Sequence, residues 1–70
     1  MNGKLIEYMR THKGWSREYL AERTGNIVSE ATIKRVERKA NYRISSVKLI
    51  AILKALGLEI KVQRQNKIQN

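Results

Sequence analysis

The chain has 70 residues, which limits it to one domain with a small core, because a chain of this size buries only about 60% of its unfolded surface. It has no cysteine, so disulfides, thiolate metal sites and a cysteine nucleophile are excluded. Fifteen Lys and Arg against six acidic residues give a net charge of +9, which favours a polyanionic partner: nucleic acid first, an anionic membrane surface second.

No apolar run approaches the roughly 18 residues that span a membrane. The N-terminus carries charge throughout and has no apolar signal-peptide core. We therefore expect a cytoplasmic protein without a membrane partner.

A first helix is predicted over residues 4–12, where Leu5, Ile6 and Met9 form an apolar stripe. Gly14 suits the left-handed position that ends such a helix.

A second helix is predicted over residues 17–24, with Ser16 as its N-cap. Its inward residues are Leu20 and Ala21, and Gly25 ends it.

A third helix is predicted over residues 30–39, with Ser29 as its N-cap. Ile33 and Val36 face inward, and Ala40 follows them on the same side.

A fourth helix is predicted over residues 46–56 and is the most apolar of the four, so we expect it to be central. Its apolar residues are Val47, Leu49, Ile50, Leu53 and Leu56.

After Gly57 the period changes, because Leu58, Ile60 and Val62 alternate with polar residues as in a half-buried strand. The expected fold is mainly α: four helices and one C-terminal β-strand in a domain over residues 1–63, followed by a flexible polar tail over 64–70.

Two short helices separated by a glycine-containing turn, the second capped and basic, indicate a helix-turn-helix. The segments GWSREYLAERTG (residues 14–25) and VSEATIKRVER (residues 28–38) resemble the phage repressor and Cro (Xre-like) family. The resemblance extends over about residues 5–57 and implies a lambda-repressor-like helix-turn-helix domain that binds double-stranded DNA.

The sequence departs from that family in three places. Arg17 stands where the family usually has a glutamine that touches the DNA backbone. The turn after Gly25 is longer by two residues, Asn26 and Ile27. A strand-like segment follows the fourth helix where many relatives have a fifth helix, which resembles antitoxin-type members whose C-terminal strands pair across a dimer.

The resemblance implies a structural salt bridge between Arg10 and Glu37 that ties the first helix to the end of the third. The alternatives for Arg10 are a phosphate contact or a solvated charge.

The resemblance also implies base contacts in the major groove from one side of the third helix, made by Glu30, Ala31, Lys34 and Arg35. Arg35 is the strongest candidate, because arginine can bind guanine O6 and N7 with two hydrogen bonds. Glu30 either accepts from cytosine N4 or favours the helix N-terminus through the dipole.

Phosphate contacts are expected from residues at the borders of these helices, namely Ser16, Arg17, Arg38, Lys39, Asn41, Tyr42 and Arg43. Arg38 and Lys39 have a second interpretation, a solvated last turn that complements the helix dipole. Tyr42 is equally an aromatic residue at the edge of the core.

The strand of Leu58, Ile60 and Val62 is expected to pair with its copy in a homodimer, which would read two half-sites about one helical turn apart. The alternative is a monomer in which the strand packs on its own helices.

These features predict a sequence-specific transcriptional regulator, a repressor. The alternative is an antitoxin that binds a toxin protein and regulates its own operon. No enzyme is expected, since His12 is the only histidine and no catalytic, metal or cofactor motif is present.

Overall fold

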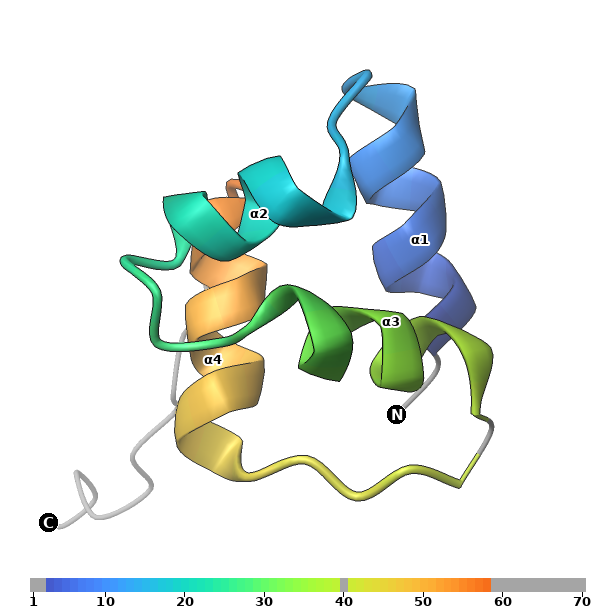
Figure 1. Cartoon of the computed structure of the whole chain (residues 1–70). Helices are drawn as coiled ribbons and strands as arrows, with labels where there is room; N and C mark the ends of the chain where they lie inside the picture. Colours follow the sequence, from blue (N-terminus) through green and yellow to red (C-terminus); the bar gives the residue numbers. More distant parts are fainter. Residues whose placement is uncertain (1–2, 40, 59–70) are drawn as a thin grey trace, which may run out of the picture.

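The structure is a computed structural model that describes residues 3–39 and 41–58. It contains the helices α1 (Gly3–His12), α2 (Arg17–Arg23), α3 (Glu30–Arg38) and α4 (Ser46–Ala55). Helix α3 packs against both α1 and α2, and α4 packs against α2 (Figure 1). The four predicted helices are confirmed, with each bound within one residue.

A serine precedes each of the last three helices, and its hydroxyl accepts a hydrogen bond from the backbone N–H three residues on. These serines are Ser16, Ser29 and Ser45. Each cap satisfies an N–H that the helix itself leaves unpaired, and replacing such a residue by alanine typically costs about 0.5–2 kcal/mol. Local chemistry therefore fixes where these helices begin.

The core is built from apolar side chains of all four helices and of the turn before α3. Its members are Ile6, Leu20, Ala21, Val28, Ile33, Val36, Ile52 and Leu56. The inward positions predicted for α2 and α3 are confirmed, and Trp15 packs against the core as a half-buried side chain.

The expectation that the fourth helix is central was wrong. Val47 is 68% exposed and Ile50 is 42% exposed, while Ile52 and Leu56 are the buried residues at that helix. Leu5 of α1, expected in the apolar stripe, is also 51% exposed. A helix that is apolar on most sides gives no periodicity from which its buried side can be chosen.

The turn between α2 and α3 follows a left-handed path, with φ of 75° at Gly25 and 64° at Asn26. The Thr24 hydroxyl donates to the carbonyl oxygen of Ala21 at 2.6 Å and accepts from the Val28 N–H at 3.2 Å. Val28 is fully buried. The turn is thus held at both ends, and it fixes the angle at which α3 leaves α2.

Gly3 lies where the start of α1 meets the end of α3. A Cβ atom at this position would overlap the backbone carbonyl oxygen of Val36. Glycine therefore allows an approach of the two helices that any other residue would prevent.

The predicted C-terminal strand and polar tail fall almost wholly on residues 59–70, outside the described residues. All regular secondary structure within the described ranges is helical. Leu58, the one described residue of the predicted strand, donates its N–H to the Leu53 carbonyl oxygen at 2.9 Å. Ala40 is likewise outside the described residues.

No helix in the part of the chain that the structure describes is long and apolar enough to cross a membrane.

The burial of α4 is tested by the same substitution at two neighbouring positions. Ile52→Val should lower the free energy of unfolding by about 0.5–1.5 kcal/mol, because Ile52 is fully buried and the change leaves a cavity. Ile50→Val removes the same methylene from an exposed position and should stay within about 0.5 kcal/mol. Urea unfolding followed by circular dichroism measures both, and equal losses would contradict this orientation of α4.

Candidate nucleic-acid interface

Helix α3 has two sides of different character. Thr32, Ile33, Val36 and Glu37 are buried on one side. The exposed residues of the helix are Glu30, Ala31, Lys34, Arg35 and Arg38. This division follows from the helical period, since positions three and four apart share a side.

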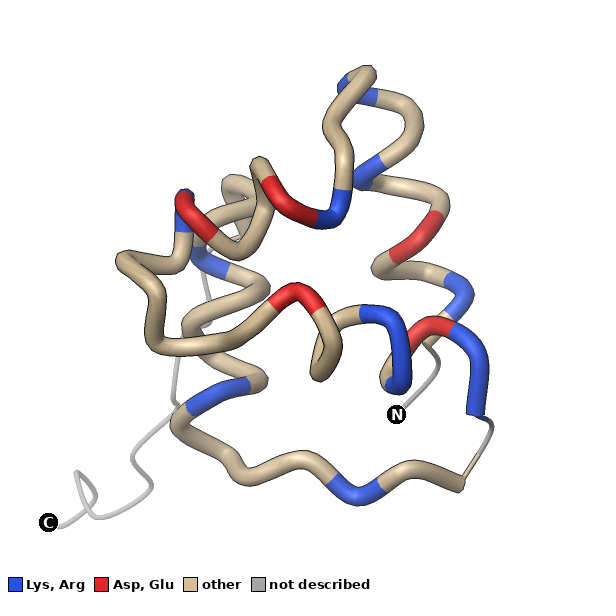
Figure 2. The backbone as a smooth tube through the Cα atoms, viewed as in Figure 1, with Lys and Arg blue, Asp and Glu red and all other residues tan. Residues whose placement is uncertain are grey.

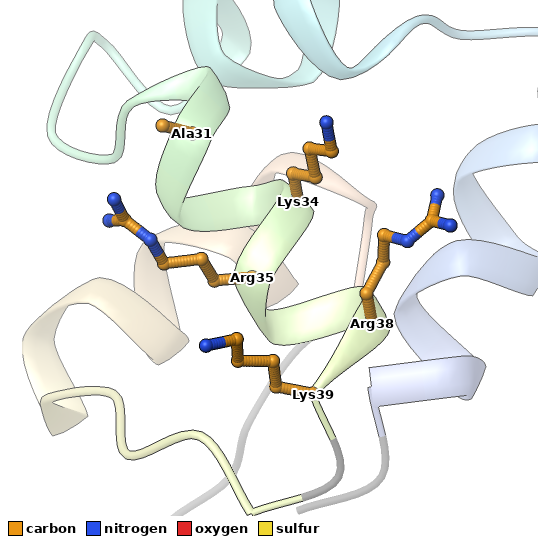
Figure 3. A pocket seen from close by; sticks show the side chains of 5 residues that line it. All are labelled: Ala31, Lys34, Arg35, Arg38 and Lys39. Atoms are coloured by element: carbon orange, nitrogen blue, oxygen red, sulfur yellow. The ribbon is translucent and has the colours of Figure 1, made fainter.

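A shallow groove of about 360 Å³ lies on the exposed side, lined by Ala31, Lys34, Arg35, Arg38 and Lys39. Figure 3 shows Arg35 and Lys39 extending to one side of α3 and Lys34 and Arg38 to the other, with Ala31 near the start of the helix. The described residues that line it include four cations and no carboxylate. The structure thus brings together three of the four predicted base-contact residues and two predicted phosphate contacts.

Glu30, the fourth predicted base contact, is exposed in the first turn of α3 and does not line this groove. An acidic residue there complements the positive end of the helix dipole. Figure 2 shows basic segments in the C-terminal half of α3, and others on α1, α2, α4 and the loop after α3.

The other predicted phosphate contacts occupy two regions. Ser16 and Arg17 lie at the start of α2. Asn41 and Arg43 are exposed in the loop between α3 and α4. Tyr42 is half-buried and packs against the core, the second of the two roles expected for it.

A buried ion-pair network holds α3 against the first two helices. The Glu37 carboxylate accepts from Arg10 through Nε at 2.7 Å and through Nη2 at 3.0 Å. Arg17 Nε donates to the same carboxylate at 2.9 Å. The Glu37 side chain is 0% exposed, so one acid of α3 is bound by arginines of both α1 and α2.

Arg10 also fixes the loop before α2, because its Nη1 donates to the Trp15 carbonyl oxygen at 2.7 Å. The hydrogen bonds to Glu37 raise the pKa of Arg10 above its ordinary value, against the opposing effect of burial. The guanidinium is therefore charged at neutral pH.

The pairing of Arg17 with Glu37 was missed from the sequence. Arg17 was expected to face phosphate, and its Nε instead faces the buried carboxylate, with 24% of the side chain exposed. This bond orients the exposed end of the guanidinium at the start of α2.

Aromatic and cationic side chains meet at the turn between α1 and α2. Trp15 packs edge-on against Tyr19, with ring centroids 5.0 Å apart. Lys13 Nζ lies 5.3 Å from the Trp15 ring centroid, and the Arg23 guanidinium carbon lies 5.6 Å from it. Such contacts hold cations over an aromatic face.

A family model described as helix-turn-helix matches residues 6–63 of the chain. The chain therefore belongs to the Cro/Xre-like helix-turn-helix family. This is a family of DNA-binding regulatory domains and not an enzyme family, so the chain is a DNA-binding transcriptional regulator. Searches of curated proteins and of solved structures found no match.

The network around Glu37 gives a sharp stability prediction. Glu37→Gln leaves two arginines facing a neutral amide, one of them buried, and breaking a buried pair costs about 3–5 kcal/mol. In a domain of this size that loss should leave the variant largely unfolded at 25 °C.

The matched control is Glu22→Gln, which makes the same change at an exposed position and should stay within about 0.5 kcal/mol of the parent. Urea and thermal unfolding measure both variants. A Glu37→Gln protein as stable as the control would contradict the expected cost of breaking the buried network.

Proposed function

We propose that the chain is a sequence-specific repressor that inserts α3 into the DNA major groove. The observation that carries the proposal is the groove of Ala31, Lys34, Arg35, Arg38 and Lys39 on the exposed side of a helix whose other side is anchored. An α-helix fits the major groove, and side chains that project from it reach base edges.

Within this surface, Arg35 is assigned to base recognition through guanine O6 and N7, and Lys34 to a single contact of the same kind. Ala31 is small enough to touch a thymine methyl group. Glu30 takes one of two roles, either accepting from cytosine N4 or stabilising the start of the helix.

Phosphate contacts are assigned to residues at the start of α2, at the end of α3 and in the loop after it. The start of α2 offers backbone N–H groups, the Ser16 hydroxyl and the exposed end of Arg17. At the end of α3 and in the loop after it, Arg38, Lys39, Asn41 and Arg43 are all exposed. Contacts of this kind position the protein on DNA without selecting a sequence.

A homodimer is part of the proposal, because one domain of this size contacts few base pairs and two-fold dimers read two half-sites. The alternating segment of Leu58, Ile60 and Val62 is assigned to strand pairing across the two-fold axis.

A second candidate is an antitoxin that keeps the same DNA surface and also binds a toxin protein. The exposed apolar residues Val47 and Ile50 of α4 favour a protein partner of some kind. A toxin-like reading frame beside the gene distinguishes this candidate from a regulator that acts alone.

Two arginine substitutions separate base recognition from phosphate binding. Arg35→Ala should cost about 1–3 kcal/mol of binding free energy and relax the preference at one base pair. Arg43→Ala should weaken binding to all sequences alike and reduce the slope of log affinity against log salt by about one.

The measurement is selection of bound sequences from a random duplex pool, followed by titrations at several salt concentrations. A palindromic selected motif supports the dimer. Equal losses on every sequence from Arg35→Ala would remove its assignment to base recognition, and an unselective parent protein would refute sequence-specific binding.

The proposed strand pairing is tested by substituting a charged residue for an apolar one in the strand. Ile60→Lys should lower the mass in solution from dimer to monomer, because it places a charge among the apolar contacts of the proposed interface. Glu59→Lys introduces the same residue on the opposite side of the proposed strand, and it should leave a larger dimeric fraction than Ile60→Lys does. Light scattering after size exclusion measures both, and a parent chain that is already monomeric would refute the pairing.

A further inference from the structure

A second groove, which shares no lining residue with the one on α3, lies between the α2–α3 turn and α4. Its volume is about 290 Å³, and it is lined by Arg23, Thr24, Ile27, Ala51, Lys54 and Ala55. Ile27, Ala51 and Ala55 supply apolar surface, while Arg23 and Lys54 supply positive charge. The described residues of the lining include no carboxylate.

Ile27 is the unusual member, because a large apolar side chain occupies an exposed turn and remains 53% accessible. Ile27 is one of the two additional residues, with Asn26, that make this turn longer than the family resemblance predicts. The turn itself does not need an apolar residue here, since Val28 already anchors it in the core. About half of the Ile27 side chain therefore faces solvent beside α4, where a partner can contact it.

The apolar surface continues from this groove along α4. Val47, Ile50, Ala51 and Lys54 are spaced at i, i+3, i+4 and i+7, so they lie along one side of the helix over about two turns. Val47 and Ile50 are exposed and Ala51 is half-buried. A continuous strip of this kind is typical of surfaces that receive one side of a partner helix.

We propose that the groove between Ile27 and α4 binds an acidic amphipathic segment of another protein. The apolar residues of that segment lie over Ile27, Ala51 and Ala55, and its carboxylates pair with Arg23 and Lys54. This inference goes beyond the proposed DNA binding and does not depend on it.

Charge decides between the possible occupants. Residues 59–70 of the chain carry three cations, Lys61, Arg64 and Lys67, against one acid, Glu59, which gives a net charge of +2. A second copy of the chain brings a net charge of +9. Both are positively charged overall, like Arg23 and Lys54, whereas an acidic segment is complementary to these two residues.

Arg23 connects the groove to a built-in reporter. It lines the groove and also lies over the ring of Trp15, which is the only tryptophan of the chain. A carboxylate that pairs with Arg23 draws its guanidinium away from the ring, which changes the fluorescence of Trp15.

The test uses the full chain, labelled with ¹⁵N, and a synthetic helical peptide of glutamate, alanine and leucine with leucines at i, i+3, i+4 and i+7. The control peptide has the same composition and charge, with its leucines distributed around the helix. We expect amide shifts at Ile27, Ala51 and Ala55 and a change in Trp15 emission with the first peptide only. Saturating duplex DNA should leave these changes in place.

Two substitutions of equal charge locate the binding surface. Ile27→Glu should lower the affinity for the first peptide by about tenfold or more, because it replaces an apolar contact by a negative charge that repels the acidic peptide. Leu5→Glu changes a side chain of similar exposure on α1 and should alter the affinity by less than about twofold. Lys54→Gln, which leaves the apolar contacts intact, should weaken binding as well.

The proposal is overturned if neither peptide binds or if both bind equally. It is also overturned if the shifts fall on Lys34 and Arg35 or disappear when duplex is added, since the peptide would then occupy the DNA surface. A fall in the mass of the free protein caused by Ile27→Glu would identify a second copy of the chain as the occupant instead.

Discussion

Glu37 lies on α3, the helix that carries the proposed recognition surface, and its carboxylate is enclosed by arginines from α1 and α2. Arg10 also holds the Trp15 carbonyl oxygen just before α2 begins. One buried carboxylate therefore sets the position of α3 relative to both preceding helices and to the loop between them. The arrangement of the groove on α3 depends on it, because a helix can present side chains to DNA only where its own backbone is held.

This network contributes to the fold through geometry more than through net stability. Moving charges out of water costs several kcal/mol per ion, and mutual attraction repays this only with good hydrogen bonding. Here both carboxylate oxygens are satisfied, and no buried side-chain polar atom of the described residues lacks a partner. Apolar packing of eight buried residues supplies the driving force, and the charged contacts select one orientation of the helices.

The sequence was sufficient to predict the four helices, and Ser16 and Ser29 marked the starts of α2 and α3 by a local hydrogen bond that needs no tertiary context. The cap of α4 by Ser45 is of the same kind and was not predicted. The sequence also indicated the inward side of α3, because the apolar residues Ile33 and Val36 are three positions apart, with the cations Lys34 and Arg35 between them. The sequence did not predict the buried side of α4. Apolar residues lie on most sides of this helix, so only packing against the other helices determines which side is buried. The Arg17 contact and the close approach at Gly3 escaped prediction for the same reason, as both depend on how separate helices meet.

The separation of the two sides of α3 has a consequence for how this framework can diverge. The buried side chains of the helix are those of Thr32, Ile33, Val36 and Glu37, whereas Ala31, Lys34 and Arg35 are exposed. Substitutions at Ala31, Lys34 and Arg35 therefore carry little folding penalty. Under the proposed mode of recognition, a lineage of such chains can change its operator while it inherits the same scaffold, so its target preference can evolve independently of the fold.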